Sequence, residues 1–135
     1  MPDKLSFGKT FYALEKAIGI AQQRNSVITS NISNLDTPGY KPKDINFKNE
    51  LERALETNHK RGLARTDPRH ISMRMNDDQM IEPYEDQGEW NGYNWSNIVS
   101  EMTKLTENNL VYRTAVEALL RKMNLLKEVI REGGR

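Results

Sequence analysis

Apolar residues recur at alternating spacings of four and three near both ends of the chain. Eight of the nine positions in the N-terminal series are apolar, as are nine of the ten in the C-terminal series. A repeat of 3.5 residues keeps one stripe of a helix facing a partner along its whole length, as in a coiled coil. The first series is Phe7, Phe11, Leu14, Ile18, Ala21, Asn25, Ile28, Ile32 and Leu35. The second series is Ile98, Met102, Leu105, Asn109, Tyr112, Val116, Leu119, Met123, Leu126 and Ile130.

These two series predict a mainly α fold with three regions. Residues 1–35 form an N-terminal assembly helix, residues 36–97 form a turn and an irregular middle, and residues 98–135 form a C-terminal assembly helix. Both a helical hairpin core within one chain and a seam between chains are consistent with the pattern.

Each series contains a single polar residue, Asn25 in the first and Asn109 in the second. If the helices run antiparallel with Leu35 opposite Ile98, the two asparagines meet. An in-register parallel alignment instead sets Asn25 against an apolar member of the second series. Because a buried asparagine is less costly when another asparagine faces it, we predict an antiparallel coiled-coil-like pair.

A second apolar stripe lies beside each series. On the N-terminal helix it consists of Ala13, Ala17, Ile20 and Val27, and on the C-terminal helix of Val111, Ala115, Ala118, Leu125 and Val129. One pair of helices buries one stripe on each member, so the second stripe is expected to remain for neighbours from other subunits.

Composition restricts the class of protein. The chain has 135 residues, 36% of them hydrophobic, which fits one domain with a modest core. Its 20 basic and 19 acidic residues do not indicate a general attraction to nucleic acid or anionic lipid. We find no apolar run of the roughly 20 residues that a membrane-spanning helix needs, and residues 1–11 lack the layout of a cleaved signal. The absence of cysteine excludes disulfides and thiolate metal sites.

Sequence motifs for enzymatic chemistry are missing. There is no glycine-rich phosphate loop, His59 and His70 lack metal-ligand spacing, and Asp77-Asp78 lacks the spaced oxygens of a calcium loop. We therefore expect a non-enzymatic protein without catalytic, cofactor-binding or metal-binding residues.

The N-terminal helix is expected to end before Pro38-Gly39. Proline cannot continue a helix and disfavours helical conformation at the residue before it. Pro38 and Gly39 also fit the central positions of a type II turn, in which glycine adopts a positive φ. From local chemistry alone, the segment is an ordinary helix stop.

The sequence around this turn resembles the N-terminal signature of flagellar rod and hook proteins, in which an asparagine-rich helix end leads into Thr-Pro-Gly-Tyr. The C-terminal segment 101–109, followed by Tyr112, is similar to the terminal helix of the same family. The short middle and the segment 67–71 make the chain most like the proximal-rod type. The matching turn residues are Asn31, Asn34, Asp36, Thr37, Pro38, Gly39 and Tyr40.

This resemblance implies a structural role in the rod of the bacterial flagellar basal body. It implies export through the flagellar apparatus, then polymerisation with itself and other rod proteins between the membrane ring and the hook. The ring–rod adaptor and the export apparatus would be partners, and no nucleic acid or membrane span is expected. The assembly residues would be those of the two series, from Leu14 to Leu35 and from Met102 to Leu126. Another rod or hook subunit, or a cytoplasmic coiled-coil adaptor or export chaperone, is the alternative.

The middle contains further predicted elements. Phe47, Leu51 and Leu55 indicate a short amphipathic helix, and alternation over residues 71–75 indicates a β segment. Where relatives often carry Asn-Asn-Val-Asp before the last helix, this chain has Trp95 in place of a smaller apolar residue. Ser96 is then the expected helix N-cap.

Charge separates within the middle. Residues 58–75 contain five basic residues and one acidic residue, whereas residues 76–89 contain six acidic residues and no basic one. The segments are either solvated loops or complementary contacts between neighbouring subunits. A nucleic-acid-binding hairpin using residues 58–75 is a further alternative, with binding that weakens steeply with salt.

Overall fold

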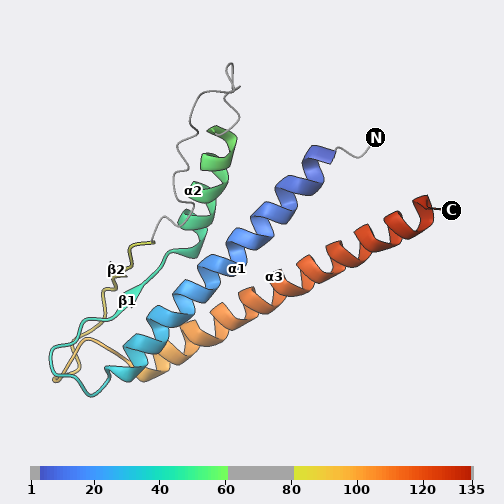
Figure 1. Ribbon diagram of the computed structural model, residues 1–135. Coiled ribbons are helices and arrows are strands. Elements are labelled where there is room, and N and C mark those ends of the chain that lie inside the picture. The colour runs from blue at the N-terminus through green and yellow to red at the C-terminus, as the bar shows by residue number, and fades with distance from the viewer. Residues whose placement is uncertain (1–3, 61–80, 135) are drawn as a thin grey trace.

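The computed structural model describes residues 4–60 and 81–134, with side chains described over 7–56 and 81–134. The elements are α1 (Lys4–Ser33), β1 (Lys43–Asp44), α2 (Phe47–Lys60), β2 (Tyr84–Glu85) and α3 (Ile98–Gly133) (Figure 1). The predicted mainly α fold, with two long terminal helices and a short helix beginning at Phe47, is confirmed.

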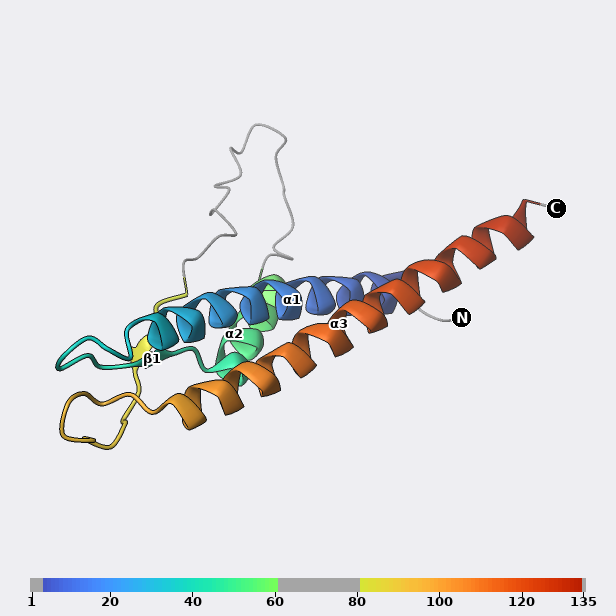
Figure 2. The same cartoon turned by 90° about the horizontal axis from the view of Figure 1, so that it is seen from below.

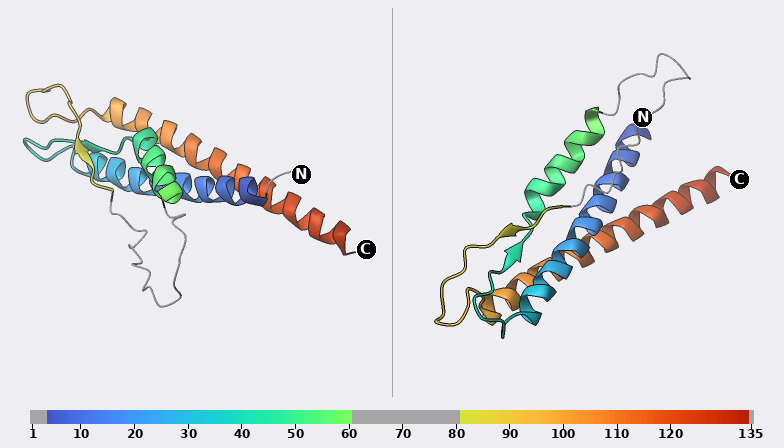
Figure 3. Two further views of the ribbon diagram at one scale, coloured as in Figure 1. Left: turned by 90° about the horizontal axis from the view of Figure 1, so that it is seen from above. Right: turned by 60° about the vertical axis from the view of Figure 1, so that its left-hand side comes forward.

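The two long helices run antiparallel. The end of α1 lies beside the start of α3, and α3 runs back along α1 and continues past the start of α1 (Figures 1 and 2). Helix α2 lies on the opposite side of α1 from α3 (Figure 3), so α1 is the central element of the described fold.

The core is small and centred on α1. An antiparallel pair of two-residue strands joins the middle segments, with Lys43 opposite Glu85 and Asp44 opposite Tyr84. Because α1 has a neighbour on each side, it contributes most of the fully buried apolar residues. Those residues are Ala17, Ile20, Ala21, Ile28, Ile45 and Ala115.

The observed register lies within one helical turn of the prediction. The side chain of Asn31 meets Glu101, and the carbonyl of Ala21 meets Asn108. The predicted alignment, with Leu35 opposite Ile98, instead sets Asn31 opposite position 102 and Ala21 opposite position 112. Antiparallel direction is therefore confirmed, with a shift of one to four residues.

The seam within the chain is rotated relative to the predicted one. Asn25 and Asn109 are both exposed, so they do not form a buried layer in the chain. The buried α3 residues are Glu101, Asn108 and Ala115, which lie seven residues apart. A heptad pattern gives the helix period but does not say which of two adjacent apolar stripes a partner covers.

The expectation that the second stripe would stay free is wrong for three of its members. Ala17, Ile20 and Ala115 are buried, whereas Met102 and Leu126 of the first stripe are exposed. Helix α1 packs against both α2 and α3, so more than one of its apolar stripes is covered within the chain.

One expectation about the middle is wrong, and another concerns residues outside the described part of the chain. The cap of α3 is Asn97 rather than Ser96, because the Asn97 side chain accepts a 2.9 Å hydrogen bond from the N–H of Val99. The predicted β segment at 71–75 lies outside the described residues, as does most of the basic segment 58–75.

Candidate functional site

Asn34 closes the end of α1. Its side-chain amide donates to the carbonyl of Ser30 at 2.8 Å, and its Oδ1 accepts from the Thr37 hydroxyl at 3.1 Å. The N–H of Thr37 also donates to the Asn34 carbonyl at 3.0 Å. These bonds satisfy groups that a helix end leaves unpaired and direct the chain into the turn.

Residues 37–40 form the predicted tight turn. The N–H of Tyr40 donates to the carbonyl of Thr37 at 3.2 Å, with Pro38 and Gly39 at the two central positions. Gly39 has a φ of 70°, the left-handed conformation that glycine adopts most readily. The local prediction is therefore confirmed.

The turn is also held by the loop that precedes α3. The N–H of Gly39 donates to the Tyr93 carbonyl at 2.9 Å, and the N–H of Trp95 donates to the Tyr40 carbonyl at 3.0 Å. The Tyr93 hydroxyl donates to the Asp36 carbonyl at 2.7 Å. The motif is thus more than a helix stop, because it joins the start of α3 to the end of α1.

Buried Asn94 completes this junction. Its amide donates to the carbonyl of Leu35, while its Oδ1 accepts from the amide of Asn91 at 2.8 Å and from the N–H of Ser96 at 3.0 Å. Trp95, by contrast, remains 37% exposed and lies against Trp90, with ring centroids 5.4 Å apart. The residue before Trp95, rather than Trp95 itself, therefore fixes the approach to α3.

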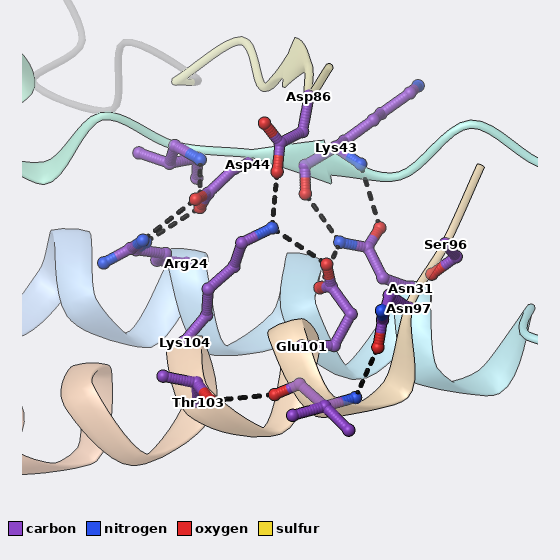
Figure 4. Close-up of polar contacts among 12 residues, drawn as sticks. Arg24, Asn31, Lys43, Asp44, Asp86, Ser96, Asn97, Glu101, Thr103 and Lys104 are labelled. Carbon is purple, nitrogen blue, oxygen red and sulfur yellow. Dashed lines mark hydrogen bonds and ion pairs between the residues drawn. The ribbon is translucent and has the colours of Figure 1, made fainter. Parts of the chain in front are cut away.

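Asn31 is the centre of a buried polar cluster (Figure 4). Its amide donates to the Lys43 carbonyl at 2.7 Å and to Glu101 Oε2 at 2.8 Å. Its Oδ1 accepts from the Lys43 N–H and from the Tyr40 hydroxyl, each at 3.0 Å. With both donors and its acceptor oxygen satisfied, one side chain connects α1, the turn, β1 and α3.

Glu101 and Lys104 extend the cluster toward the second strand. Glu101 is 1% exposed, and its Oε1 accepts from Lys104 Nζ at 2.8 Å. The same ammonium donates to Asp86, which follows β2 (Figure 4). Burial opposes the charge on the ammonium, but hydrogen bonds and charges of Asp86 and Glu101 outweigh it and raise the pKa of Lys104.

A second, partly buried ion pair lies about two turns from Asn31 along α1. Arg24 Nε and Nη2 donate to the two carboxylate oxygens of Asp44 at 2.8 and 2.9 Å. Burial favours the neutral form of Asp44, yet the hydrogen bonds from Arg24 and from the Ile45 N–H lower the pKa of Asp44 below its ordinary value. Two-point contact between guanidinium and carboxylate also fixes the orientation of β1 on α1.

We name Arg24, Asn31, Asp44, Asp86, Glu101 and Lys104 the polar clamp. It includes Asn31 of the predicted turn motif, but its five charged residues were not singled out from the sequence as site residues. The heptad spacing of Glu101, Asn108 and Ala115 could have indicated a buried position for Glu101. The clamp joins separate segments and can fix their relative geometry.

The predicted assembly residues fall into three groups. Ala21 and Ile28 are fully buried in the chain. Leu14, Ile18, Ile32, Leu35, Leu105, Tyr112, Val116 and Leu119 are half-buried. The exposed ones are Asn25, Met102, Asn109, Met123 and Leu126.

Helix α3 exposes further apolar side chains around its circumference. Leu110 is 67% exposed and Leu120 is 54% exposed, although each lies inside a long helix. A large exposed apolar surface of this kind is typical of sites that bind another protein or a membrane. We did not single out these two leucines from the sequence.

Within residues 4–60 and 81–134, no group of three or more His, Asp or Glu could hold a metal ion. No helix in the same part of the chain is long and apolar enough to cross a membrane.

Several known proteins are similar to this chain over nearly its whole length. A family described as flagella basal body rod protein matches residues 11–41, which include the second half of α1 and the turn. The chain is 34% identical to flagellar basal body rod protein FlgB of Bacillus subtilis (strain 168), covering 94% of this chain and 97% of that protein. It is 31% identical to FlgB of Aeromonas hydrophila, covering 94% and 96%. It is 29% identical to FlgB of Escherichia coli (strain K12), covering 98% and 99%.

Proposed function

Because the chain belongs to the family of flagellar basal body rod proteins, we propose that it assembles through its two terminal helices into the proximal rod. The chain is a structural subunit of the rod in the flagellar basal body, and it assembles with other rod components. The FlgB relatives support the proximal position, between the membrane ring and the hook. The proposed further contacts are other copies of the chain, the ring–rod adaptor and, before assembly, the export apparatus.

The exposed apolar surface of α3 is the observation that carries this proposal. Helix α3 has 36 residues, of which only Glu101, Asn108 and Ala115 are fully buried in the chain. Covering one apolar side chain of leucine size contributes about 1.5–3 kcal/mol. Several such side chains along one helix therefore supply a strong driving force for packing against neighbouring subunits.

The polar clamp has a defined part in this proposal. Assembly requires that α1 and α3 present their free surfaces in one fixed geometry. Asn31 and Glu101 bond directly across the two helices, and Tyr40 of the turn bonds to the same asparagine. The turn motif and the clamp thus fix the angle between the assembly helices, while the exposed apolar residues provide the contacts.

Paired substitution of Leu110 and Leu120 by glutamate tests the proposal. Both side chains are exposed, so the isolated chain should keep its helical circular dichroism. Its incorporation into purified basal bodies, and motility of the cells, should be lost because two charges would be buried at subunit contacts. The matched control is Thr114→Glu, an exposed α3 position near Leu110 that adds charge without removing an apolar contact.

Normal incorporation of the paired variant would contradict assembly through this surface. Detection of the wild-type chain only in the cytosol, and never in basal bodies, would instead favour an adaptor or chaperone.

A further inference from the structure

The loop between β2 and α3 contains the only Asn-Gly pair of the sequence, Asn91-Gly92, and both residues are exposed to water. Because glycine has no side chain, its backbone nitrogen can reach the side chain of the preceding asparagine with little steric hindrance. In that reaction the nitrogen of Gly92 bonds to Cγ of Asn91, the bond from Cγ to Nδ2 breaks, and ammonia leaves. Water then opens the cyclic imide to aspartate or isoaspartate. The balance is water consumed and ammonia released, without oxidation, reduction or a cofactor.

Asn91 is also the residue that holds this loop together. Its Oδ1 accepts from the N–H of Tyr93 and from the N–H of Asn94, each at 2.9 Å. Its Nδ2 donates to Oδ1 of Asn94 at 2.8 Å and to the carbonyl of Ser96 at 3.0 Å. The N–H of Asn91 itself donates to the Asn94 carbonyl at 3.0 Å. Both donors and both lone pairs of the side-chain amide are therefore used within residues 91–96.

These hydrogen bonds oppose the reaction at Asn91. Attack by Gly92 requires the side-chain amide to turn toward the next peptide nitrogen, which breaks the bonds from the N–H groups of Tyr93 and Asn94. The reaction therefore proceeds from molecules in which the loop has opened. Its rate is reduced in proportion to the small fraction of molecules in that open state.

Conversion of Asn91 would in turn weaken the loop. The carboxylate of the product still accepts from the two N–H groups, but it has no hydrogen to donate to Oδ1 of Asn94 or to the carbonyl of Ser96. A negative charge then faces two acceptor oxygens. Asn94 cannot turn its amide toward this charge without losing the hydrogen bond that it donates to the carbonyl of Leu35. Isoaspartate also lengthens the backbone, which displaces every residue of the loop after position 91.

We infer that Asn91 is a deamidation site that the folded loop protects, and that its conversion releases the start of α3 from the turn after α1. The bonds at risk join Gly39 to Tyr93 and Trp95 to Tyr40, and both lie directly beyond Asn91 in the loop. The modification goes beyond the structural role of the chain, because it records how long this loop has been open.

Deamidation rates test the protection. Purified chain is incubated in mildly alkaline buffer with and without urea at unfolding concentrations, and mass spectrometry of the peptide containing Asn91 measures the conversion. The native rate should be about tenfold or more below the rate in urea, because the loop must open first. Equal rates in the native and the unfolded chain would overturn the inference.

Two variants assign the protection to the hydrogen bonds of Asn91. Asn94→Ala removes one acceptor of Nδ2 and should raise the native rate toward the rate in urea, with the helical circular dichroism retained. Tyr93→Phe is the matched control, because it keeps the N–H that Asn91 accepts from and should leave the native rate slow. An Asn94→Ala rate equal to that of Tyr93→Phe would overturn this assignment.

Asn91→Asp, which carries the carboxylate of the product, tests the effect on the junction. Amide hydrogen exchange should accelerate about tenfold at Gly39 and Trp95, whose N–H groups bond across the junction, while residues 101–115 keep wild-type protection. Gln87→Glu is the matched control, since it adds the same charge at an exposed position of the same loop. Unchanged exchange at Gly39 and Trp95 in Asn91→Asp, or equal acceleration in Gln87→Glu, would overturn the release of α3 by this modification.

Discussion

Replacing Glu101 by alanine should strongly destabilise the isolated chain. Its carboxylate is buried and accepts one hydrogen bond from Asn31 and one from the Lys104 ammonium, both at 2.8 Å. The substitution removes an acceptor from the Asn31 amide and one of the two described partners of Lys104. It also leaves a cavity where α1, α3 and the middle segment meet.

The expected magnitude follows from these contacts. A hydrogen bond to a charged group contributes about 1.5–3 kcal/mol, and breaking a buried ion pair costs about 3–5 kcal/mol. Lys104 keeps its bond to Asp86, which places the loss near the lower end, at about 3 kcal/mol. With a urea dependence of about 1–3 kcal/mol per molar, the unfolding midpoint should fall by roughly 1–3 M.

Equilibrium urea unfolding, followed by circular dichroism, measures this loss. Glu117→Ala is the matched control, because Glu117 is an exposed carboxylate on α3 that makes a long contact, 3.9 Å, with the exposed Arg121. A double-mutant cycle with Asn31→Ala should give a coupling of about 0.5–3 kcal/mol. A Glu101→Ala midpoint equal to that of Glu117→Ala, or zero coupling to Asn31, would refute the buried clamp.

Four further predictions concern the turn, pH, local stability and register. Pro38→Ala combined with Gly39→Ala should destabilise the turn by about 1–2 kcal/mol, because alanine disfavours the φ of 70° at Gly39. The double variant should also be incorporated less into the rod. Normal incorporation would show that the motif is only a helix stop. The folded-state pKa of Asp44 lies below its unfolded value, so the Arg24–Asp44 pair stabilises the fold above about pH 4, and this stabilisation is lost as pH falls through the folded-state pKa. The urea midpoint of Asp44→Asn should therefore depend less on pH in this acid range than that of the wild type. An unchanged pH dependence would argue against the pair. In dilute monomer, amide hydrogen exchange should be fast over residues 123–133 and slower over residues 101–115, because only residues 101–115 include fully buried α3 side chains. Uniform protection along α3 would contradict this difference in local stability. Asn109→Leu should change the free energy of unfolding by less than about 0.5 kcal/mol. Asn108→Leu should lower it by about 1–3 kcal/mol, because it removes the 2.8 Å hydrogen bond to the Ala21 carbonyl. Equal effects of the two substitutions would contradict a seam between α1 and α3 that runs through Asn108.

The sequence allowed the helices, their direction and the turn to be predicted. Strict 4-3 spacing from Phe7 to Leu35 and from Ile98 to Ile130 indicated helices that α1 and α3 confirm. Proline followed by glycine at positions 38 and 39 has few alternatives to a tight turn, and the φ of Gly39 agrees with it.

The polar clamp could not be predicted in the same way. Glu101 and Lys104 are charged residues at a helix start, where such residues are ordinarily solvated. Their burial depends on Asp86, 18 residues from Lys104, and on Asn31, 70 residues from Glu101. The two-residue strands are likewise too short to show an alternating pattern.

The sequence pattern placed the α1–α3 seam one residue away from its observed position on α3. Asn108 and Asn109 are adjacent and chemically identical, yet only Asn108 is buried in the chain. The predicted stripe through Met102, Asn109 and Met123 lies on the free side of α3, where the proposed subunit contacts would form. The single heptad pattern in the sequence thus contains both residues of the α1–α3 seam and residues of the exposed surface of α3.

A cryo-electron microscopy reconstruction of a basal body containing this chain tests the central claim most directly. The measurement is how much of the Leu110, Leu120 and Ile130 side chains neighbouring subunits cover. We predict that all three are buried against other subunits, with the Asn31–Glu101 contact intact inside each copy. A rod in which α3 keeps this surface open to solvent, and in which the middle residues 36–97 make the subunit contacts, would contradict assembly through the terminal helices.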